Sequence, residues 1–273
     1  MAHPADSTPA VRSMPVPGVG RDVRLWGRKA RGRSQPLVLH FHGGSFASGD
    51  LDSGAHLAEL MVRAGAVVAS FDYPLAPEHR FPEALEAGYA ALSWLHGQRG
   101  RLAGAGAPLY VAGEEAGGNL AAALAMMARD RLHPPLAGQV LVAPMLDPCL
   151  GTPSLRSKLA GQTDCRWAVG WQQYLRGPMD AEHPYAVPGR AQRLAGLARA
   201  LVMTGPDDPM HDEALAYARR LRDAGVEVKC AVLGTPTGWP EALEQPAREE
   251  CPCAQEAQCF LQDFFQAPTP PPH

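Results

Sequence analysis

Short runs of apolar, β-favouring residues recur along the chain, and stretches with helical spacing of apolar positions separate most of them. Runs of roughly four to eight such residues predict buried strands, and the amphipathic stretches predict helices. The predicted strands are Asp22–Trp26 at an edge, Leu37–Phe41, Ala66–Phe71, 109–113, Gly138–Ala143, Ala200–Thr204 and Val226–Val232. The predicted helices are Ala55–Ala64, Glu83–Gly97, an alanine-rich run ending near Arg131, Asp212–Ala224 and Ala254–Phe265. Strands that alternate with helices predict an α/β fold with a mostly parallel, twisted sheet and helices on both faces.

Candidate catalytic and binding residues follow several of these strands. The pair Gly43 and Gly44, then Glu115, Asp208 and Thr237, each come after a predicted strand. In parallel sheets, binding and catalytic sites gather at the carboxyl ends of the strands. We therefore expect these residues to meet at one edge of the sheet.

The 273 residues are a common size for one α/β unit, and the chain contains no internal repeat. Its proline content divides it into three parts. Residues 1–20 are expected to form a loose arm, 21–266 a single domain, and 267–273 a proline-rich tail.

The overall charge is balanced, with a net charge of −3 from 25 basic and 28 acidic side chains. This balance gives no electrostatic footprint for nucleic acid or an anionic membrane. The chain also lacks an apolar run long enough to span a bilayer and a basic-then-apolar leader, so a cytoplasmic location is expected. A small-molecule ligand or substrate is the expected partner, and the sequence allows oligomerisation.

The six cysteines fall late in the chain, without the rhythm of a disulfide framework, and are expected to be free thiols. Cys251, Cys253 and Cys259 are the candidates for a metal site. Their spacing departs from the usual Cys-x2-Cys pair and no nearby histidine completes a ligand set. We therefore expect neither a metal nor a cofactor.

The join between the strand ending at Gly113 and the alanine-rich helix carries the most specific motif, Gly113-Glu114-Glu115-Ala116-Gly117. A tight turn from strand to helix holds its apex residue in a strained conformation, exposed above the sheet with a helix N-terminus behind it. The apex residue here is Glu115. Upstream, adjacent glycines after a strand let backbone N–H groups face a cavity, which suits an oxyanion hole.

With these motifs in view, the chain resembles the hormone-sensitive-lipase-like branch of the α/β-hydrolases, which includes acetyl esterases and arylacetamide deacetylases. The likeness covers roughly 37–265. It is carried by His42-Gly43-Gly44-Ser45-Phe46, Tyr73-Pro74-Leu75-Ala76-Pro77-Glu78, the Gly-x-Ser-x-Gly-like elbow, Asp208-Pro209-Met210-His211-Asp212-Glu213 and Gly234-Thr235-Pro236-Thr237-Gly238-Trp239. The family usually has a longer N-terminal cap, so the resemblance implies an α/β-hydrolase fold with a reduced cap.

The resemblance also assigns roles to individual positions. It implies that Gly43, Gly44 and Ala116 supply oxyanion N–H groups, that His42 shapes their turn, and that Asp208 is the triad carboxylate. Glu115 stands where the family has its nucleophilic serine, and Thr237 stands where it has its histidine base.

Both substitutions remove groups that serine-esterase chemistry needs. That chemistry requires a hydroxyl that attacks and an imidazole that takes and returns a proton near neutral pH. A carboxylate at the elbow is drawn to the backbone N–H groups and the helix N-terminus. We therefore expect Glu115 to occupy the oxyanion hole and plug it. His211 is expected at the surface, and Trp167, Trp171 and Tyr174, at helical spacing, as packing or the roof of a pocket.

Three functions are compatible with these residues. The first is a pseudo-hydrolase that has lost serine-esterase activity and binds a small ligand or partner. The second is an enzyme with redirected acid/base chemistry, of lyase, cyclase or dehydratase type, using Glu115 and Asp208. The third is a residual carboxylesterase that activates water through Glu115 or His211, or that uses an unconventional nucleophile. The first is the main expectation from the sequence, because both the nucleophile and the base are substituted.

Overall fold

The computed structural model describes residues 11–149, 151–160, 165–244 and 252–268. Within these ranges eight strands form one sheet in the order β1-β2-β4-β3-β5-β6-β7-β8. The antiparallel pairs are β1–β2 and β2–β4, and all other neighbours are parallel. The strands are β1 (Val11–Val16), β2 (Arg21–Trp26), β3 (Leu37–Phe41), β4 (Val67–Phe71), β5 (Leu109–Glu114), β6 (Gly138–Val142), β7 (Ala200–Thr204) and β8 (Val228–Val232). The predicted mostly parallel α/β sheet is confirmed.

The centre of this sheet is the core of the molecule. Every residue of β3, β4, β5, β6 and β7 is buried. Continuous burial is expected when helices cover both faces of a parallel sheet. The strands read as unbroken apolar runs in the sequence for this reason.

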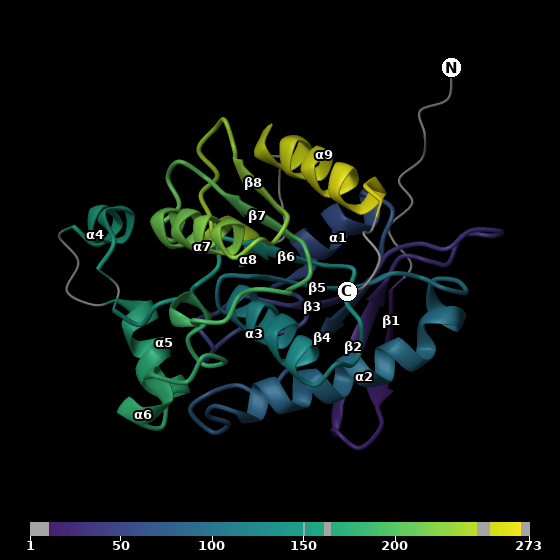
Figure 1. Cartoon of the computed structure of the whole chain (residues 1–273), viewed down its shortest axis with the longest axis horizontal. Coiled ribbons are helices and arrows are strands. Elements are labelled where there is room, and N and C mark those ends of the chain that lie inside the picture. The colour runs from purple at the N-terminus through teal and green to yellow at the C-terminus, as the bar shows by residue number, and fades with distance from the viewer. Residues whose placement is uncertain (1–10, 150, 161–164, 245–251, 269–273) are drawn as a thin grey trace.

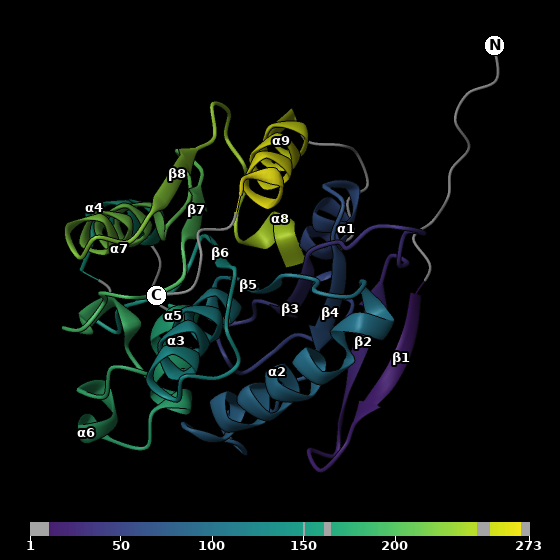
Figure 2. The ribbon, with the colours of Figure 1, turned by 45° about the vertical axis from the view of Figure 1, so that its right-hand side comes forward.

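Helices cover the two faces. α1 packs with α9 on one face and α2 packs with α3 on the other (Figures 1 and 2). Many small residues in α3 let this helix lie close against the sheet. The helices are α1 (Ala55–Arg63), α2 (Glu83–Leu102), α3 (Ala116–Asp130), α4 (Pro153–Leu159), α5 (Arg166–Tyr174), α6 (Pro178–Ala181), α7 (His211–Asp223), α8 (Glu241–Glu244) and α9 (Pro252–Gln266), with a 3₁₀ turn at Pro188–Arg190.

The N-terminal segment differs from the expected loose arm. Residues 11–16 form β1, which pairs along its full length with β2, so β1 is the edge strand in place of the predicted Asp22–Trp26. The ladder explains the difference, since backbone pairing orders a segment whose side chains are mostly exposed. Residues 1–10 of the predicted arm, and 269–273 of the predicted tail, lie outside the described residues.

The segment between β6 and β7 forms the short helices α4, α5 and α6; α4 lies beside α7, and α5 and α6 lie apart from it (Figure 1). The sequence indicated only an irregular stretch with an aromatic stripe there. α5 carries that stripe, and Trp167, Trp171 and Tyr174 are all buried. This insertion thus brings aromatic side chains over the strand ends. Within the described ranges, no helix combines the length and apolar character needed to cross a bilayer.

Candidate active site

The turn between β5 and α3 has the predicted elbow geometry. Glu115 sits at its apex with φ 52° and ψ −115°, a region that residues with a side chain rarely adopt. The flanking glycines make the turn sterically feasible. A Cβ on Gly113 would lie 2.2 Å from the Gly117 carbonyl oxygen, and one on Gly117 would lie 2.0 Å from that of Phe41. The spacing Gly-x-Glu-x-Gly therefore reflects two close backbone approaches around one strained residue.

The Glu115 carboxylate turns inward and is completely buried. Its Oε2 accepts hydrogen bonds from the backbone N–H groups of Gly44 at 2.6 Å and Ser45 at 2.7 Å, and a longer one of 3.4 Å from Ala116. Ala116 is the first residue of α3, so the positive end of the helix dipole also faces this oxygen. The geometry is that of an oxyanion hole with a carboxylate oxygen in it.

The second oxygen of Glu115 is held by side chains from the β3 loop and from α5. Oε1 accepts hydrogen bonds from Trp167 Nε1 at 2.7 Å, from the Ser45 hydroxyl at 3.0 Å and from the Arg166 guanidinium at 3.2 Å. The Arg166 side chain is 38% exposed, whereas Glu115 is fully buried. The α5 helix thus closes over the carboxylate and supplies it with a cation at the solvent boundary.

Sequence reasoning missed Ser45, Arg166 and Trp167 as contacts of Glu115. Ser45 was visible as the departure from the third glycine of the oxyanion motif. Trp167 was noted only for its helical spacing. Arg166 gave no signal of its own.

The glycine loop after β3 divides its N–H groups between two acids. Those of Gly44 and Ser45 reach Glu115, but that of Gly43 donates to Glu114 Oε1 at 3.3 Å. The expected contribution of Gly43 to the hole is therefore made by Ser45. The loop backbone explains the shift, since it directs the Gly43 N–H to Glu114 and the next two N–H groups to Glu115.

His42 supports this loop from behind. Its Nδ1 lies 2.6 Å from the Gly43 carbonyl oxygen, and its ring stacks on Tyr73 with the centroids 4.4 Å apart. Tyr73 donates its hydroxyl to the His42 carbonyl oxygen at 3.0 Å. Burial lowers the pKa of His42, so the imidazole stays neutral at physiological pH. These contacts hold the glycine turn in position.

A buried chain of hydrogen bonds continues from Glu114 across the sheet. Glu114 Oε2 lies 2.7 Å from His40 Nε2, and His40 Nδ1 lies 2.9 Å from the Ser70 hydroxyl. Trp26 donates its Nε1–H to the same hydroxyl at 3.0 Å. These hydrogen bonds connect β5, β3, β4 and β2. Glu114, at one end of them, also accepts the hydrogen bond from the Gly43 N–H.

The loop after β7 does not bring Asp208 to Thr237. The Asp208 carboxylate accepts hydrogen bonds from the Thr204 hydroxyl at 2.7 Å and the Met210 N–H at 2.8 Å. Burial raises the pKa of Asp208 to about 7 against the opposing effect of these bonds. His211, at the start of α7, places Nδ1 2.9 Å from the Gly205 carbonyl oxygen and is half-buried, not fully at the surface.

Asp207 is the acid that faces position 237. It accepts hydrogen bonds from the Thr237 N–H at 2.7 Å, the Thr237 hydroxyl at 3.0 Å and the Gly238 N–H at 2.8 Å. Partial burial opposes ionisation, but these bonds outweigh it and lower the pKa of Asp207. Asp207 thus holds the loop after β8 in place through these hydrogen bonds. The hydrogen bonds that Glu115 and Asp208 make are to separate sets of partners.

The described residues contain no group of three or more His, Cys, Asp or Glu side chains arranged to hold a metal ion. Cys253 is disulfide-bonded, which corrects the expectation of a free thiol at that position, whereas Cys149, Cys165, Cys230 and Cys259 are free. Cys251 lies outside the described residues.

Comparison with known proteins agrees with this architecture. A sequence model of the alpha/beta hydrolase fold family matches residues 38–236. The chain belongs to the α/β-hydrolase family. Its relatives place it in the hormone-sensitive-lipase-like branch that the motifs indicated.

Several relatives of this α/β-hydrolase are named esterases. It is 39% identical to the esterase LipI of Mycobacterium tuberculosis over 199 residues, 71% of this chain and 62% of that protein. It is 36% identical over 241 residues to the carboxylic ester hydrolase LipN of the same species, 83% of this chain and 63% of that protein. The matched part therefore spans less than two thirds of these relatives' length.

Solved structures give the same result. A hyperthermophilic esterase from the archaeon Pyrobaculum calidifontis superimposes with a TM-score of 0.81 and 32% identity, covering 94% of this chain and 85% of that one. These findings contradict the expectation of a pseudo-hydrolase without esterase activity, because named ester hydrolases share this fold and about a third or more of the sequence. They favour the third function weighed above, carboxylesterase activity.

Proposed function

We propose that this α/β-hydrolase is a carboxylic ester hydrolase whose reaction centre is the elbow. The observation that carries the proposal is the oxyanion hole. The N–H groups of Gly44 and Ser45 meet a single anionic oxygen at 2.6 and 2.7 Å, as they would meet the oxyanion of a tetrahedral intermediate. The esterases among its relatives support the same reaction class.

The reaction begins when the ester carbonyl oxygen replaces Oε2 of Glu115 in the hole. Because Thr237 cannot act as the imidazole base, the displaced Glu115 carboxylate takes that role and removes a proton from a water molecule. The water oxygen bonds to the carbonyl carbon and the negative charge passes to the carbonyl oxygen. When the intermediate collapses, the bond to the alcohol oxygen breaks and Glu115 returns its proton to the departing alkoxide. The products are a carboxylic acid and an alcohol.

This route has no covalent enzyme intermediate and is slower than a serine–histidine mechanism. General base catalysis contributes about 10²–10⁴-fold. Removing one oxyanion donor from a hydrolase costs about 10²–10³-fold, which measures what such donors add. Substrate must also displace a carboxylate with several hydrogen bonds. We therefore expect modest turnover.

Redirected acid/base chemistry with Glu115 and Asp208 has less support. The two carboxylates are bound by different segments, Glu115 by the β3 loop and α5 and Asp208 by Thr204 and Met210. No observation favours this function over ester hydrolysis.

The test is hydrolysis of p-nitrophenyl acetate by the wild type and by Glu115→Gln, which keeps the shape but removes the base. A matched control is Glu227→Gln at an exposed position. We expect steady turnover without a burst in the wild type, no fluorophosphonate labelling, and at least a hundredfold loss in Glu115→Gln alone. Wild-type turnover no faster than that of Glu115→Gln contradicts the proposal.

The double variant Glu115→Ser with Thr237→His is a second arm. It restores the family's hydroxyl and imidazole and should become reactive to fluorophosphonate. Strong labelling of the wild type would contradict the water mechanism, because it requires a nucleophilic side chain other than Glu115.

A further inference from the structure

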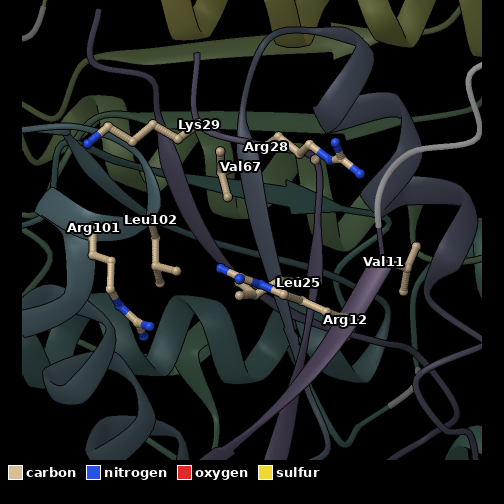
Figure 3. A pocket seen from close by; sticks show the side chains of 9 residues that line it. Val11, Arg12, Leu25, Arg28, Lys29, Val67, Arg101 and Leu102 are labelled. Carbon is tan, nitrogen blue, oxygen red and sulfur yellow. The ribbon is translucent and has the colours of Figure 1, made fainter. Parts of the chain in front are cut away.

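A cavity lies near the starts of the central strands, at the opposite end of these strands from Glu115. Leu37 of β3 pairs with Val67 of β4 and with Leu109 of β5, so these strands all start at one edge, and the elbow follows the end of β5 at the other. The cavity has a volume of about 440 Å³ and is lined by Val67 and by Leu102 at the end of α2 (Figure 3). It is therefore separate from the reaction centre. Its volume lies within the usual range of small-molecule pockets.

Four cationic side chains line this cavity, Arg12 from β1, Arg28 and Lys29 from the turn after β2, and Arg101 from α2. Figure 3 shows the side chains of Arg12 and Arg101 reaching toward each other across its middle. A cluster of positive charge is notable in a chain with a net charge of −3. Such a cluster raises the local concentration of anions.

None of these four cations pairs with a carboxylate in the part of the chain that the structure describes. Lys29 donates to the Gly100 carbonyl oxygen at 2.8 Å, and Arg101 donates to the side-chain amide oxygen of Gln98 at 3.1 Å. Both acceptors are neutral. Among the described residues, no acidic side chain therefore forms an ion pair with these four cations.

The floor of the cavity is apolar. Leu25, Val67 and Leu102 line it with side chains that are 2%, 2% and 3% exposed, and Val11 at the rim is 46% exposed. A purely ionic ligand would leave this surface unused. A ligand with an apolar body that rests here gains about 25 cal/mol per Å² of apolar area removed from water, most of it from the ligand's own surface and from Val11.

We propose that this cavity binds a small amphipathic anion, a carboxylate or phosphate group on an alkyl or aryl body. The anionic group lies between Arg12 and Arg101, where guanidinium groups bind both kinds of oxyanion in two-point contacts. The apolar body rests on Leu25 and Leu102. The proposal does not depend on the reaction at Glu115.

The experiment is isothermal titration calorimetry of the full chain with octanoate and with octyl phosphate, which separate the two anion types. Octanol has the apolar body but no charge, and inorganic phosphate has the charge but no apolar body, so the two controls measure each contribution separately. We expect at least one of the anionic amphiphiles to bind at least tenfold more tightly than octanol and inorganic phosphate. Equal binding of octanol, or no binding of either amphiphile, overturns the proposal.

The site is assigned by a pair of double variants with the same change in net charge. Arg12→Gln with Arg101→Gln should weaken binding at least tenfold, whereas Arg156→Gln with Arg219→Gln, at exposed positions elsewhere, should not. Equal weakening in both pairs points to overall charge and contradicts the site. Thermal unfolding of each variant checks the fold, and Arg12→Gln alone, at an exposed edge position, gives a second measurement if the double variant is unstable.

Discussion

At the scale of single residues, the resting position of Glu115 opposes the reaction proposed for it. Its carboxylate must leave the hole before an ester carbonyl can enter, and Trp167 on α5 holds Oε1 at 2.7 Å. A hydrogen bond to a charged group is worth about 1.5–3 kcal/mol. Trp167 therefore stabilises the occupied hole and competes with substrate.

We expect Trp167→Phe to raise kcat/KM for p-nitrophenyl acetate by about tenfold, because weakening the resting state by about 1.4 kcal/mol has that effect. Trp171→Phe is the matched control, since Trp171 lies on the same helix and its buried Nε1 has no hydrogen-bond partner in the described structure. Steady-state kinetics of both variants check the prediction. Equal kcat/KM in the two variants would count against it.

Site residues could be predicted where a short stretch of sequence marked them, and not where only tertiary packing brings them to the site. Gly113 and Gly117 were recognisable because two close backbone approaches require glycine at a fixed spacing. Arg166 and Trp167 lie 51 and 52 residues beyond Glu115, and only the packing of α5 brings them there. Asp207 and Asp208 are adjacent and chemically identical, so only the backbone of the turn decides which faces Thr237.

At the scale of elements, a buried arginine holds the C-terminal helix against the sheet. Arg199 precedes β7 and is 4% exposed. It donates to the carbonyl oxygens of Phe264 at 2.9 Å and Ala267 at 3.0 Å, at the end of α9, and to the hydroxyl of Tyr110 at 3.2 Å. A cation at the end of a helix also complements its dipole. Arg199 therefore joins α9 to the central strand β5.

Replacing Arg199 with methionine keeps much of the volume but leaves these buried acceptors without a donor. We expect a loss of about 2–4 kcal/mol in the free energy of unfolding. Urea denaturation measures this loss, and hydrogen exchange should show faster opening of α9 than of β5. The control Arg219→Met, at an exposed position of α7, should change stability by less than about 0.5 kcal/mol. Similar losses in both variants would refute the role.

The elements themselves were largely predictable, because strand and helix periodicities are strong in a parallel α/β sheet. β3 and β7 have the predicted bounds, and α2 continues past the predicted end to Leu102. Arg99 and Arg101 in its last turn favour that extension, since cations stabilise helix C-termini. β1 was missed because its exposed side chains carry little apolar signal and its order comes from pairing with β2.

At the scale of the whole molecule, two buried acids affect the pH dependence of stability. Burial raises the pKa of Glu213 to about 7 and that of Asp208 to about 7. Each folded-state pKa lies above the ordinary value, so the folded state keeps protons that the unfolded state releases between about pH 4 and 7. The contribution of these groups to stability is greatest below pH 4 and declines as pH rises to 7.

Glu213→Gln removes this titration while keeping an amide oxygen to accept from the N–H groups of Leu146 and Asp147. We expect its free energy of unfolding, relative to the wild type, to rise by roughly 1–3 kcal/mol between pH 5 and pH 8. Denaturation curves at the two pH values, with Glu227→Gln as the exposed control, measure it. A difference that is the same at both pH values would show that Glu213 does not titrate in this range.

The hydrogen-bond chain from Glu114 through His40 and Ser70 to Trp26 makes the reaction centre dependent on the antiparallel margin of the molecule. Trp26 lies at the far end of this chain from Glu114, yet it helps to orient the loop that holds the carbonyl oxygen in the proposed reaction. The glycine turn after β3 and the elbow after β5 therefore depend on the strands around them for their geometry. If the glycine turn and the elbow were moved into another scaffold, Glu114 would lose its hydrogen bond to His40 and the groups behind it. Four neighbouring strands would have to be transferred with them.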